Sequence, residues 1–164
     1  MPHLHTADLV IELADRLRDA GWTLATAESC TGGLIAAACT ELAGSSDWFE
    51  RGFVTYSNAA KTELLGVDAA LIAAHGAVSE PVARAMAAGA AERACTPVAL
   101  SVTGIAGPTG GNASKPVGTV WFGWRLPDGR VDTEVRRFDG DRAAVRSAAA
   151  QHALAGLLQR LGAA

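Results

Sequence analysis

Three short stretches of the chain carry residues whose types and spacing could do chemistry. They are Ala27-Glu28-Ser29-Cys30-Thr31-Gly32-Gly33, Tyr56-Ser57-Asn58-Ala59-Ala60-Lys61 and Thr103-Gly104-Ile105-Ala106-Gly107-Pro108. In the first stretch, Ser29 lies between an expected strand and an expected helix, where unpaired backbone N–H groups can stabilise an oxyanion. Ser29 is therefore a candidate nucleophile, although a serine that merely caps the helix would give the same pattern.

A serine nucleophile needs a base, and no histidine occupies a neighbouring turn. Lys61 can act as that base if burial and adjacent dipoles lower its pKa, as in Ser–Lys hydrolases. Tyr56 precedes Lys61 at an expected strand-to-helix junction, so both side chains could point into one crevice. The competing interpretations are an exposed Lys61, because lysines usually lie at the surface, and a Tyr56 that packs in the core.

Two neighbours of Ser29 leave alternatives open. Cys30 competes as the nucleophile, because a helix N-terminus favours a thiolate, but no histidine follows nearby to form a Cys–His pair. Glu28 is either a buried charge that orients Lys61 or a solvent-facing residue at the end of a strand.

The third stretch opens a glycine-rich segment, residues 104–118, that predicts a loop able to bind an anion or a nucleotide. Glycine lets backbone N–H groups approach a phosphate closely. The segment matches neither a Walker loop nor GxGxxG, so the signal is weak by itself. Arg142, at the start of the last expected helix, could meet the same phosphate or lie free on the surface.

Hydrophobic periodicity and turn residues predict the elements that must position these groups. Helices are expected over residues 7–20, 34–43, 68–74, 79–94 and 141–161, with a short one carrying Lys61, and strands over 22–27, 49–57, 98–103, 117–126 and 131–138. Thr31 and Asn58 are the predicted N-caps of the two helices that follow the first two stretches. Pro127-Asp128-Gly129-Arg130 predicts a hairpin between the last two strands.

This order of elements predicts an α/β fold, a three-layer α/β/α sandwich with a mixed β-sheet, in a single domain over residues 1–164. If the strands before the three stretches are parallel neighbours, their turns converge at one sheet edge. That edge is the usual ligand crevice of such folds.

Composition excludes several classes of protein. A net charge of −3 with 19% charged residues argues against a phosphate-backbone binder and against an acidic disordered tail. No apolar run is long enough to cross a membrane, and no secretory signal is present, so a cytoplasmic protein without a membrane partner is expected. Three cysteines without a CxxC pair and scattered histidines predict neither disulfides nor a metal site. The 18 glycines exceed the usual share, and we expect them to clear the backbone around one pocket.

In order along the chain, AESCTGG, VTYSNAAK, GAVSEPVA, VTGIAGPTGG, KPVGTVWFG and FDGDR together resemble the CinA C-terminal domain family, whose stand-alone members include nicotinamide-nucleotide amidohydrolases. The resemblance spans nearly the whole chain. It implies an α/β/α homodimer that converts nicotinamide mononucleotide to nicotinic acid mononucleotide and ammonia. It also implies Ser29 as nucleophile, with Lys61 and Tyr56 as its partners. The residues that it implies along the ligand pocket are Cys30, Thr31, Gly32, Gly33, Asn58, Thr103, Gly104, Ala106, Gly107 and Arg142.

Backbone N–H groups near residues 30–33 would polarise the substrate carbonyl, so neither a metal nor a cofactor is expected. Larger family members carry an additional N-terminal domain that resembles a molybdopterin-binding fold, and its activity is not expected of this sequence. The alternatives to an enzyme are a nucleotide-binding module without turnover and a dimerisation module. The low charge gives no support for nucleic-acid binding. The set of Ser29, Tyr56 and Lys61 favours the enzyme.

Overall fold

The structure, a computed structural model that describes residues 4–162, is built on one five-stranded sheet. Its strands are β1 (Leu24–Glu28), β2 (Phe49–Val54), β3 (Val98–Gly104), β4 (Thr119–Arg125) and β5 (Val131–Arg137). They lie in the order β2-β1-β3-β4-β5. β2, β1 and β3 are parallel, whereas β4 is antiparallel to both of its neighbours. The predicted mixed sheet and the predicted hairpin are therefore confirmed.

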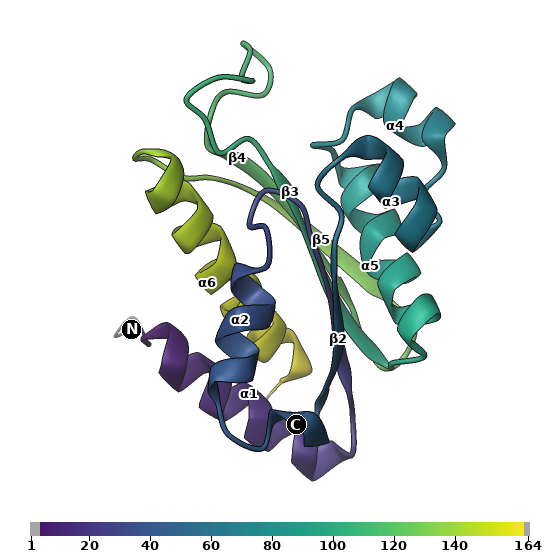
Figure 1. Ribbon diagram of the computed structural model, residues 1–164, viewed down its shortest axis with the longest axis vertical. Helices are drawn as coiled ribbons and strands as arrows, with labels where there is room; N and C mark the ends of the chain where they lie inside the picture. Colours follow the sequence, from purple (N-terminus) through teal and green to yellow (C-terminus); the bar gives the residue numbers. More distant parts are fainter. Residues whose placement is uncertain (1–3, 163–164) are drawn as a thin grey trace.

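Helices cover both faces of this sheet (Figure 1). One layer contains α1 (Thr6–Ala20), α2 (Leu34–Glu41) and α6 (Arg142–Leu161), and the other contains α3 (Asn58–Leu65), α4 (Ala69–His75) and α5 (Glu80–Ala94). A short 3₁₀ turn, Ser45–Asp47, precedes β2. The three-layer α/β/α architecture is as predicted, and the six helices and five strands lie close to the predicted ranges.

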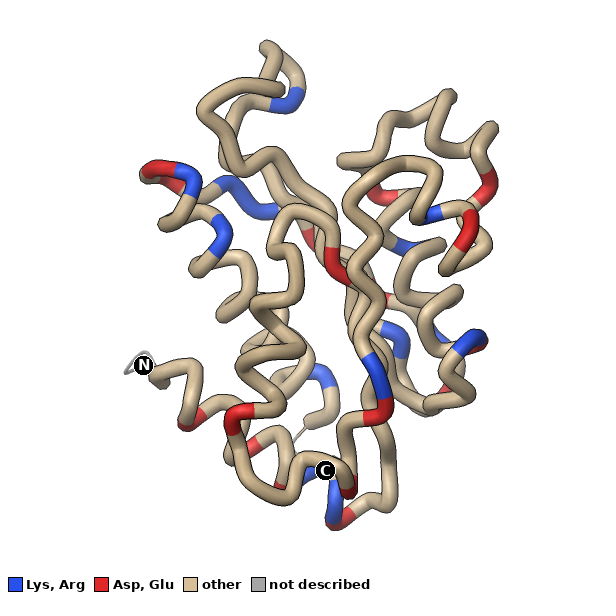
Figure 2. The backbone as a smooth tube through the Cα atoms, viewed as in Figure 1, with Lys and Arg blue, Asp and Glu red and all other residues tan. Residues whose placement is uncertain are grey.

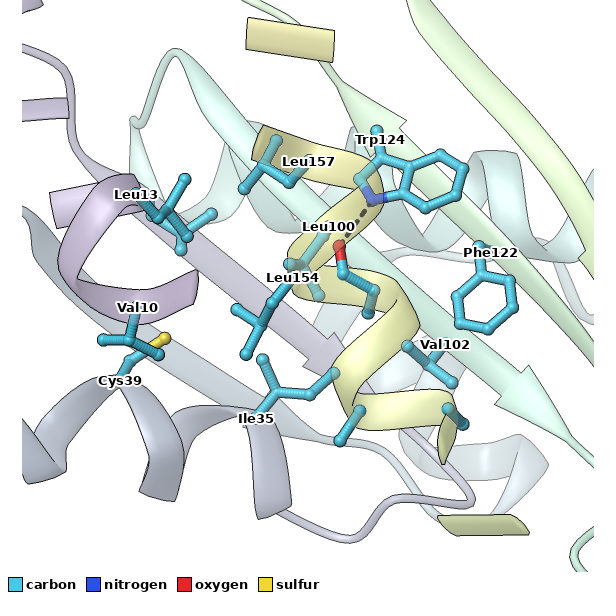
Figure 3. Close-up of a cluster of buried hydrophobic side chains, with 14 of the residues drawn as sticks. Val10, Leu13, Ile35, Cys39, Leu100, Val102, Phe122, Trp124, Leu154 and Leu157 are labelled. Carbon is cyan, nitrogen blue, oxygen red and sulfur yellow. Dashed lines mark hydrogen bonds between the residues drawn. The ribbon is translucent and has the colours of Figure 1, made fainter. Parts of the chain in front are cut away.

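The two faces of the sheet carry separate cores because successive side chains of a strand point to opposite sides. Leu100 packs with Leu154 and Trp124 under α6, whereas the adjacent Ala99 packs under α5. The indole Nε1 of Trp124 donates to the carbonyl of Ala153 at 2.9 Å, as the dashed line in Figure 3 shows. Small residues let α5 approach the sheet closely: a Cβ at Gly123 of β4 would lie 2.7 Å from the carbonyl oxygen of Ala83.

Helix starts differ from the prediction at two places. Thr31 is not the N-cap of α2. Gly33 is the N-cap residue, and it has no side chain that could accept from the first turn of the helix. The buried carboxylate of Glu28 instead accepts from the N–H groups of Ile35 and Ala36, at 2.9 and 3.1 Å. Asn58 likewise is not a cap, because the hydroxyl of the preceding residue, Ser57, accepts from Ala60 N and begins α3 one residue earlier.

Several strand ends fall short of the prediction because of the adjoining turns, whereas β1 and β3 each extend one residue further than predicted, to Glu28 and Gly104. Trp22 remains in the turn that ends α1, where its N–H donates to the carbonyl of Leu17 at 2.9 Å. Residues 55–57 leave the sheet to form the entry into α3, and Val117 lies in a turn closed by Thr119 N and Pro116 O at 3.0 Å. The glycine-rich loop therefore ends one residue before β4 begins.

The carboxyl ends of β2, β1 and β3 meet at one edge of the sheet, as the parallel order requires. The turn after β1, the turn after β2 and the loop after β3 come together there. Charged residues of both signs are interspersed along the backbone in Figure 2, and no continuous basic stripe is visible in that view. Among residues 4–162, none of the helices is long and apolar enough to span a bilayer.

Candidate active site

The turn after β1 holds Ser29 at this edge through backbone hydrogen bonds. Ser29 N donates to the carbonyl of Val102 on β3, and Ser29 O accepts from Gly32 N, both at 3.0 Å. Gly32 and Gly33 both have positive φ, +58° and +108°, in a second tight turn closed from Leu34 N to Thr31 O. Positive φ at two successive residues strains any residue with a Cβ, which explains the Gly-Gly pair.

Lys61 is buried, with 1% of its surface exposed, and its ammonium nitrogen faces Ser29. Nζ lies 3.0 Å from Ser29 Oγ, 3.0 Å from the carbonyl of Thr55 and 3.3 Å from the carbonyl of Tyr56. The interpretation of Lys61 as an exposed cation is therefore wrong. The interpretation of Ser29 as a helix cap is also wrong, because its hydroxyl contacts Lys61 and, at 3.5 Å, the Tyr56 carbonyl.

The surroundings of Lys61 are buried but carry no negative partner. Burial lowers the pKa of Lys61 below its ordinary value. Within the described residues, no carboxylate lies within ion-pair distance of its Nζ. A neutral amine has two N–H groups and one lone pair. The Thr55 and Tyr56 carbonyls can take the two N–H groups, which leaves the lone pair to accept the proton of Ser29 Oγ.

The two neighbours of Ser29 have different environments. Cys30 is 4% exposed, and burial raises the pKa of its thiol to about 11, so the thiolate that a cysteine nucleophile needs is disfavoured. Glu28 is buried, and its carboxylate accepts from Thr31 Oγ1 at 2.7 Å as well as from the first turn of α2. Glu28 is thus a buried charge as one interpretation held, but its hydrogen bonds fix α2 and none reaches Lys61.

Hydrogen bonds of Arg142 connect the segment at Tyr56 with the glycine-rich loop at Gly107. Tyr56 is 60% exposed, so the interpretation of a core-packed tyrosine is wrong. Its hydroxyl accepts from Arg142 Nη2 at 2.9 Å, and Arg142 Nη1 donates to the carbonyl of Gly107 at 2.8 Å. The structure gives the Tyr56 hydroxyl no hydrogen bond to Ser29 or Lys61. Arg142 is exposed but not free, because it links the start of α6 to both segments.

A cavity of about 330 Å³ opens beside Ser29, which is within the size range of small-molecule sites. Its lining is Ser29, Cys30, Tyr56, Asn58, Lys61, Ala77, Val78, Thr103, Gly104, Ile105, Ala106, Gly107, Thr109, Gly110 and Arg142. The three candidate catalytic residues and seven of the ten candidate binding residues are in this lining. Thr31, Gly32 and Gly33 are not, because they form the turn behind Ser29.

Backbone N–H groups near Ser29 are partly used by the protein itself. Those of Gly32 and Leu34 donate within the turn, and those of Ile35 and Ala36 donate to Glu28. For the N–H groups of Cys30, Thr31 and Gly33, residues 4–162 supply no acceptor. Of these three residues only Cys30 lines the cavity, so its N–H group, next to the nucleophile, is the donor that this turn offers to an oxyanion.

Sequence reasoning missed two parts of the site. Ala77 and Val78 line the cavity because the hydroxyl of Thr103 donates to the Ala77 carbonyl at 2.9 Å and holds that segment against β3. No local signal marks them. Arg146 donates to carbonyls of the Ser29 turn. Its position four residues after Arg142 places both on one face of the same helix, a spacing that could have revealed it.

Comparisons with known proteins agree with this geometry. The model of the "CinA C-terminal domain" family matches residues 6–161. The chain is 58% identical over 147 residues to a "Nicotinamide-nucleotide amidohydrolase PncC" of Enterobacter agglomerans, covering 90% of each. It is 52% identical to the protein of the same name from Escherichia coli strain K12, covering 91% of this chain and 90% of that one. A "CinA-like protein" of Syntrophobacter fumaroxidans is 55% identical, but the match covers only 33% of that longer protein.

Solved structures give the same result. A competence damage-inducible protein A from Klebsiella pneumoniae superposes with a TM-score of 0.93 at 41% identity, over 96% of this chain and 98% of that one. A competence/damage inducible protein from Agrobacterium tumefaciens superposes with a TM-score of 0.90 at 44% identity, over 94% of each chain. The two matches extend over at least 94% of this chain.

Proposed function

The chain belongs to the CinA C-terminal domain family, and from that premise we propose that it is an amidohydrolase that cleaves the carboxamide C–N bond of nicotinamide mononucleotide. The products are nicotinic acid mononucleotide and ammonia. The names of the relatives that match over 90% of their length support this substrate. The observation that carries the chemistry is the 3.0 Å contact between Ser29 Oγ and a buried Lys61 Nζ with no anionic partner among the described residues.

In the first step, neutral Lys61 takes the proton of Ser29 as Oγ attacks the carboxamide carbon. An Oγ–C bond forms, and the carbonyl oxygen becomes an oxyanion. We assign this charge to the free N–H group of Cys30, which follows Ser29 directly and belongs to the cavity lining. Preorganised donors of this kind lower the barrier to acyl transfer.

In the second step, protonated Lys61 returns its proton to the amide nitrogen. The C–N bond breaks, ammonia leaves, and the nicotinoyl group remains as an ester on Ser29. Water then attacks this ester while Lys61 accepts one proton of the water. Lys61 returns that proton to Ser29 Oγ as the Oγ–C bond breaks, and the released carboxylic acid ionises in water. All atoms of the two products come from the substrate and one water molecule, so the proposed reaction requires no cofactor.

Tyr56 supports this cycle in two ways. Its carbonyl is one of the two acceptors that hold Lys61. Its hydroxyl oxygen accepts from Arg142, which leaves the O–H hydrogen available to the pocket and gives Tyr56 a place in the proton path. Arg142 uses two of its N–H groups on protein acceptors, and we assign the others, together with the N–H groups of the loop at Gly107, to the substrate phosphate.

Ammonia release tests the proposal. Nicotinamide mononucleotide, nicotinamide and the dinucleotide are compared as substrates of the wild-type protein, with Ser29→Ala as the control. We expect turnover of the mononucleotide and a loss on the order of 10⁴ to 10⁶ in the variant, as for removal of other activated serines. Thermal stabilisation by the mononucleotide without ammonia would instead identify a binding module. Near wild-type activity in Ser29→Ala would remove Ser29 from the mechanism.

A further inference from the structure

The Ser29 turn is held from behind by one side chain that does not line the cavity. Arg146, on α6, donates from Nε to the carbonyl of Cys30 at 3.0 Å and from Nη2 to the carbonyl of Thr31 at 3.2 Å. Within residues 4–162, no other side chain donates to a main-chain carbonyl of residues 29–33. The turn that carries the nucleophile therefore has a single side-chain anchor on its backbone, and that anchor comes from a helix more than 100 residues away in sequence.

The two contacts fix two consecutive peptide planes next to Ser29. A peptide unit is planar, so holding its carbonyl also fixes the direction of its N–H group. The carbonyl of Cys30 shares its plane with Thr31 N–H, one of the free donors. The carbonyl of Thr31 shares its plane with Gly32 N–H, which donates to Ser29 O at 3.0 Å.

The charge of the guanidinium adds to this geometric effect. A carbonyl that accepts from a cation polarises its own peptide unit, so the N–H group on the other side becomes a stronger donor. Only the planar fork of arginine reaches two neighbouring carbonyls at once; lysine offers a point charge. Gly32 leaves the room that this fork needs, because a Cβ there would lie 3.3 Å from Arg146 Nη2.

We propose that Arg146 is a positioning residue for the hydrolysis. By holding the carbonyls of Cys30 and Thr31 it keeps Ser29 Oγ against Lys61 and, through the Gly32 N–H bond to Ser29 O, keeps the N–H group of Cys30 in place for the oxyanion. The inference rests on the proposed function, since it takes Ser29 as the nucleophile. It predicts that Arg146 acts on the chemical step and leaves substrate binding unchanged, because Arg146 is not in the cavity lining.

The test compares Arg146→Ala and Arg146→Lys with Arg125→Ala. Arg125 is a matched control, because its Nη1 also donates to a backbone carbonyl, that of Pro97 at 2.7 Å, at the opposite end of the sheet. Both kcat and KM for ammonia release are measured at equal folded fraction. A second readout, independent of the substrate, is the rate at which an aryl sulfonyl fluoride labels Ser29, followed by mass spectrometry.

We expect Arg146→Ala to lower kcat about 10²-fold, the cost typical of a small misplacement in an active site, with KM within about threefold of wild type. Arg146→Lys should recover little of this loss, whereas added guanidinium ion should restore part of the activity of Arg146→Ala. The labelling rate of Ser29 should fall in parallel with kcat. Arg125→Ala should keep the wild-type kcat and should not respond to guanidinium.

Three results would overturn the inference: a kcat for Arg146→Ala within about twofold of wild type, a rise in KM without a fall in kcat, or a loss no larger than that of Arg125→Ala. If Arg146→Ala fails to fold, Arg146→Lys carries the same comparison. If wild-type Ser29 is labelled but the mononucleotide yields no ammonia, the proposed substrate is wrong and the labelling ratio alone decides on Arg146. If wild-type Ser29 is not labelled at all, both proposals fall.

Discussion

Two clusters of basic side chains lie on opposite faces of the sheet, a half-buried one around His152 and Arg160 and a buried one around Lys61, and they differ in their partners. Under α6, His152 Nε2 lies 2.8 Å from Glu134 Oε1, and Arg160 lies within 3.3 Å of both Glu134 and Asp132 while stacking on Trp124 at 3.8 Å. On the α3 face, Lys61 meets only a hydroxyl and two carbonyls. One cluster contains anions, and the other does not.

The difference decides which group can exchange a proton. Burial by itself would raise the pKa of Glu134, but hydrogen bonds from Arg136, His152 and Arg160 outweigh it and lower that pKa, so the carboxylate stays charged. For Lys61, burial lowers the pKa and no carboxylate opposes it. Glu134 thus remains the fixed anion of an ionic network, although burial also lowers the pKa of His152 below its ordinary value. Lys61, held among neutral acceptors, moves toward the neutral form that a general base requires.

The largest expected effect comes from Lys61→Arg. Arginine cannot give up its proton near neutral pH, so it cannot accept the proton of Ser29. We expect ammonia release to fall on the order of 10³-fold or more, within the range for loss of a general base together with its nucleophile's activation. Lys115→Arg, the same change at the other lysine of the chain, is the control. Retained activity in Lys61→Arg would mean that the cation acts only through its charge.

The next effect is a pH dependence that follows from the lowered pKa of Lys61. Because the neutral amine is the active form, kcat/KM should rise about tenfold per pH unit below that pKa and level off above it. The folded protein binds fewer protons than the unfolded chain between the lowered pKa and the ordinary value of 10.5, so the free energy of unfolding should also rise with pH in that window. A flat acid limb in the rate profile would exclude a titrating base.

Substitution in the cluster of Glu134, His152 and Arg160 should change the stability of the protein and leave its activity unchanged. Glu134→Gln leaves His152 and Arg160 without their shared anion, and we expect about 1–3 kcal/mol lower free energy of unfolding at neutral pH. Chemical denaturation at several pH values measures it. The stabilisation is present above the ordinary pKa of Glu134 and is lost as pH falls through its lowered pKa, so the difference should vanish in acid. A large change in kcat would contradict the separation of the two clusters.

The smallest effect is expected for Cys30→Ala. Its thiol has a pKa raised to about 11, so almost none is thiolate near neutral pH, and alanine keeps the N–H group that faces the oxyanion. We expect kcat within about threefold of wild type. Ammonia release measures it beside Ser29→Ala, and a loss comparable to that of Ser29→Ala would transfer the nucleophile's role to Cys30.

The sequence predicted those helices, strands and turns well whose formation depends only on residues close together in the chain. The apolar run at β3 and the Pro127–Arg130 hairpin depend on neighbouring residues alone, and both are observed. The strand–turn–helix around Ser29 was predicted for the same reason. Helix caps were predicted less well. Thr31 is not the cap because α2 begins two residues later than its position requires, and the Thr31 hydroxyl donates to Glu28, whose carboxylate accepts from N–H groups in the first turn of α2.

The environment of Lys61 could not be predicted, because it depends on which way backbone carbonyls point. Its partners, Thr55 O and Tyr56 O, come from the turn that leaves β2. Arg146 and Ala77 reach the site only through the packing of α6 and through the hydroxyl of Thr103. The contacts of Arg146 and Ala77 join segments far apart in sequence, and hydrophobic periodicity carries no information about them.

The chain contains only two lysines, Lys61 and Lys115, which makes a direct titration possible. In protein labelled with ¹³C at lysine Cε, nuclear magnetic resonance gives two signals, and Lys115→Arg assigns them. Lys115 lies outside the site, where its Nζ donates to the carbonyl of His75. We predict that the Lys61 signal titrates below the ordinary lysine pKa of 10.5, at the pH where the acid limb of kcat/KM levels off. A Lys61 signal that titrates at 10.5 or above would contradict a neutral lysine as the base for Ser29.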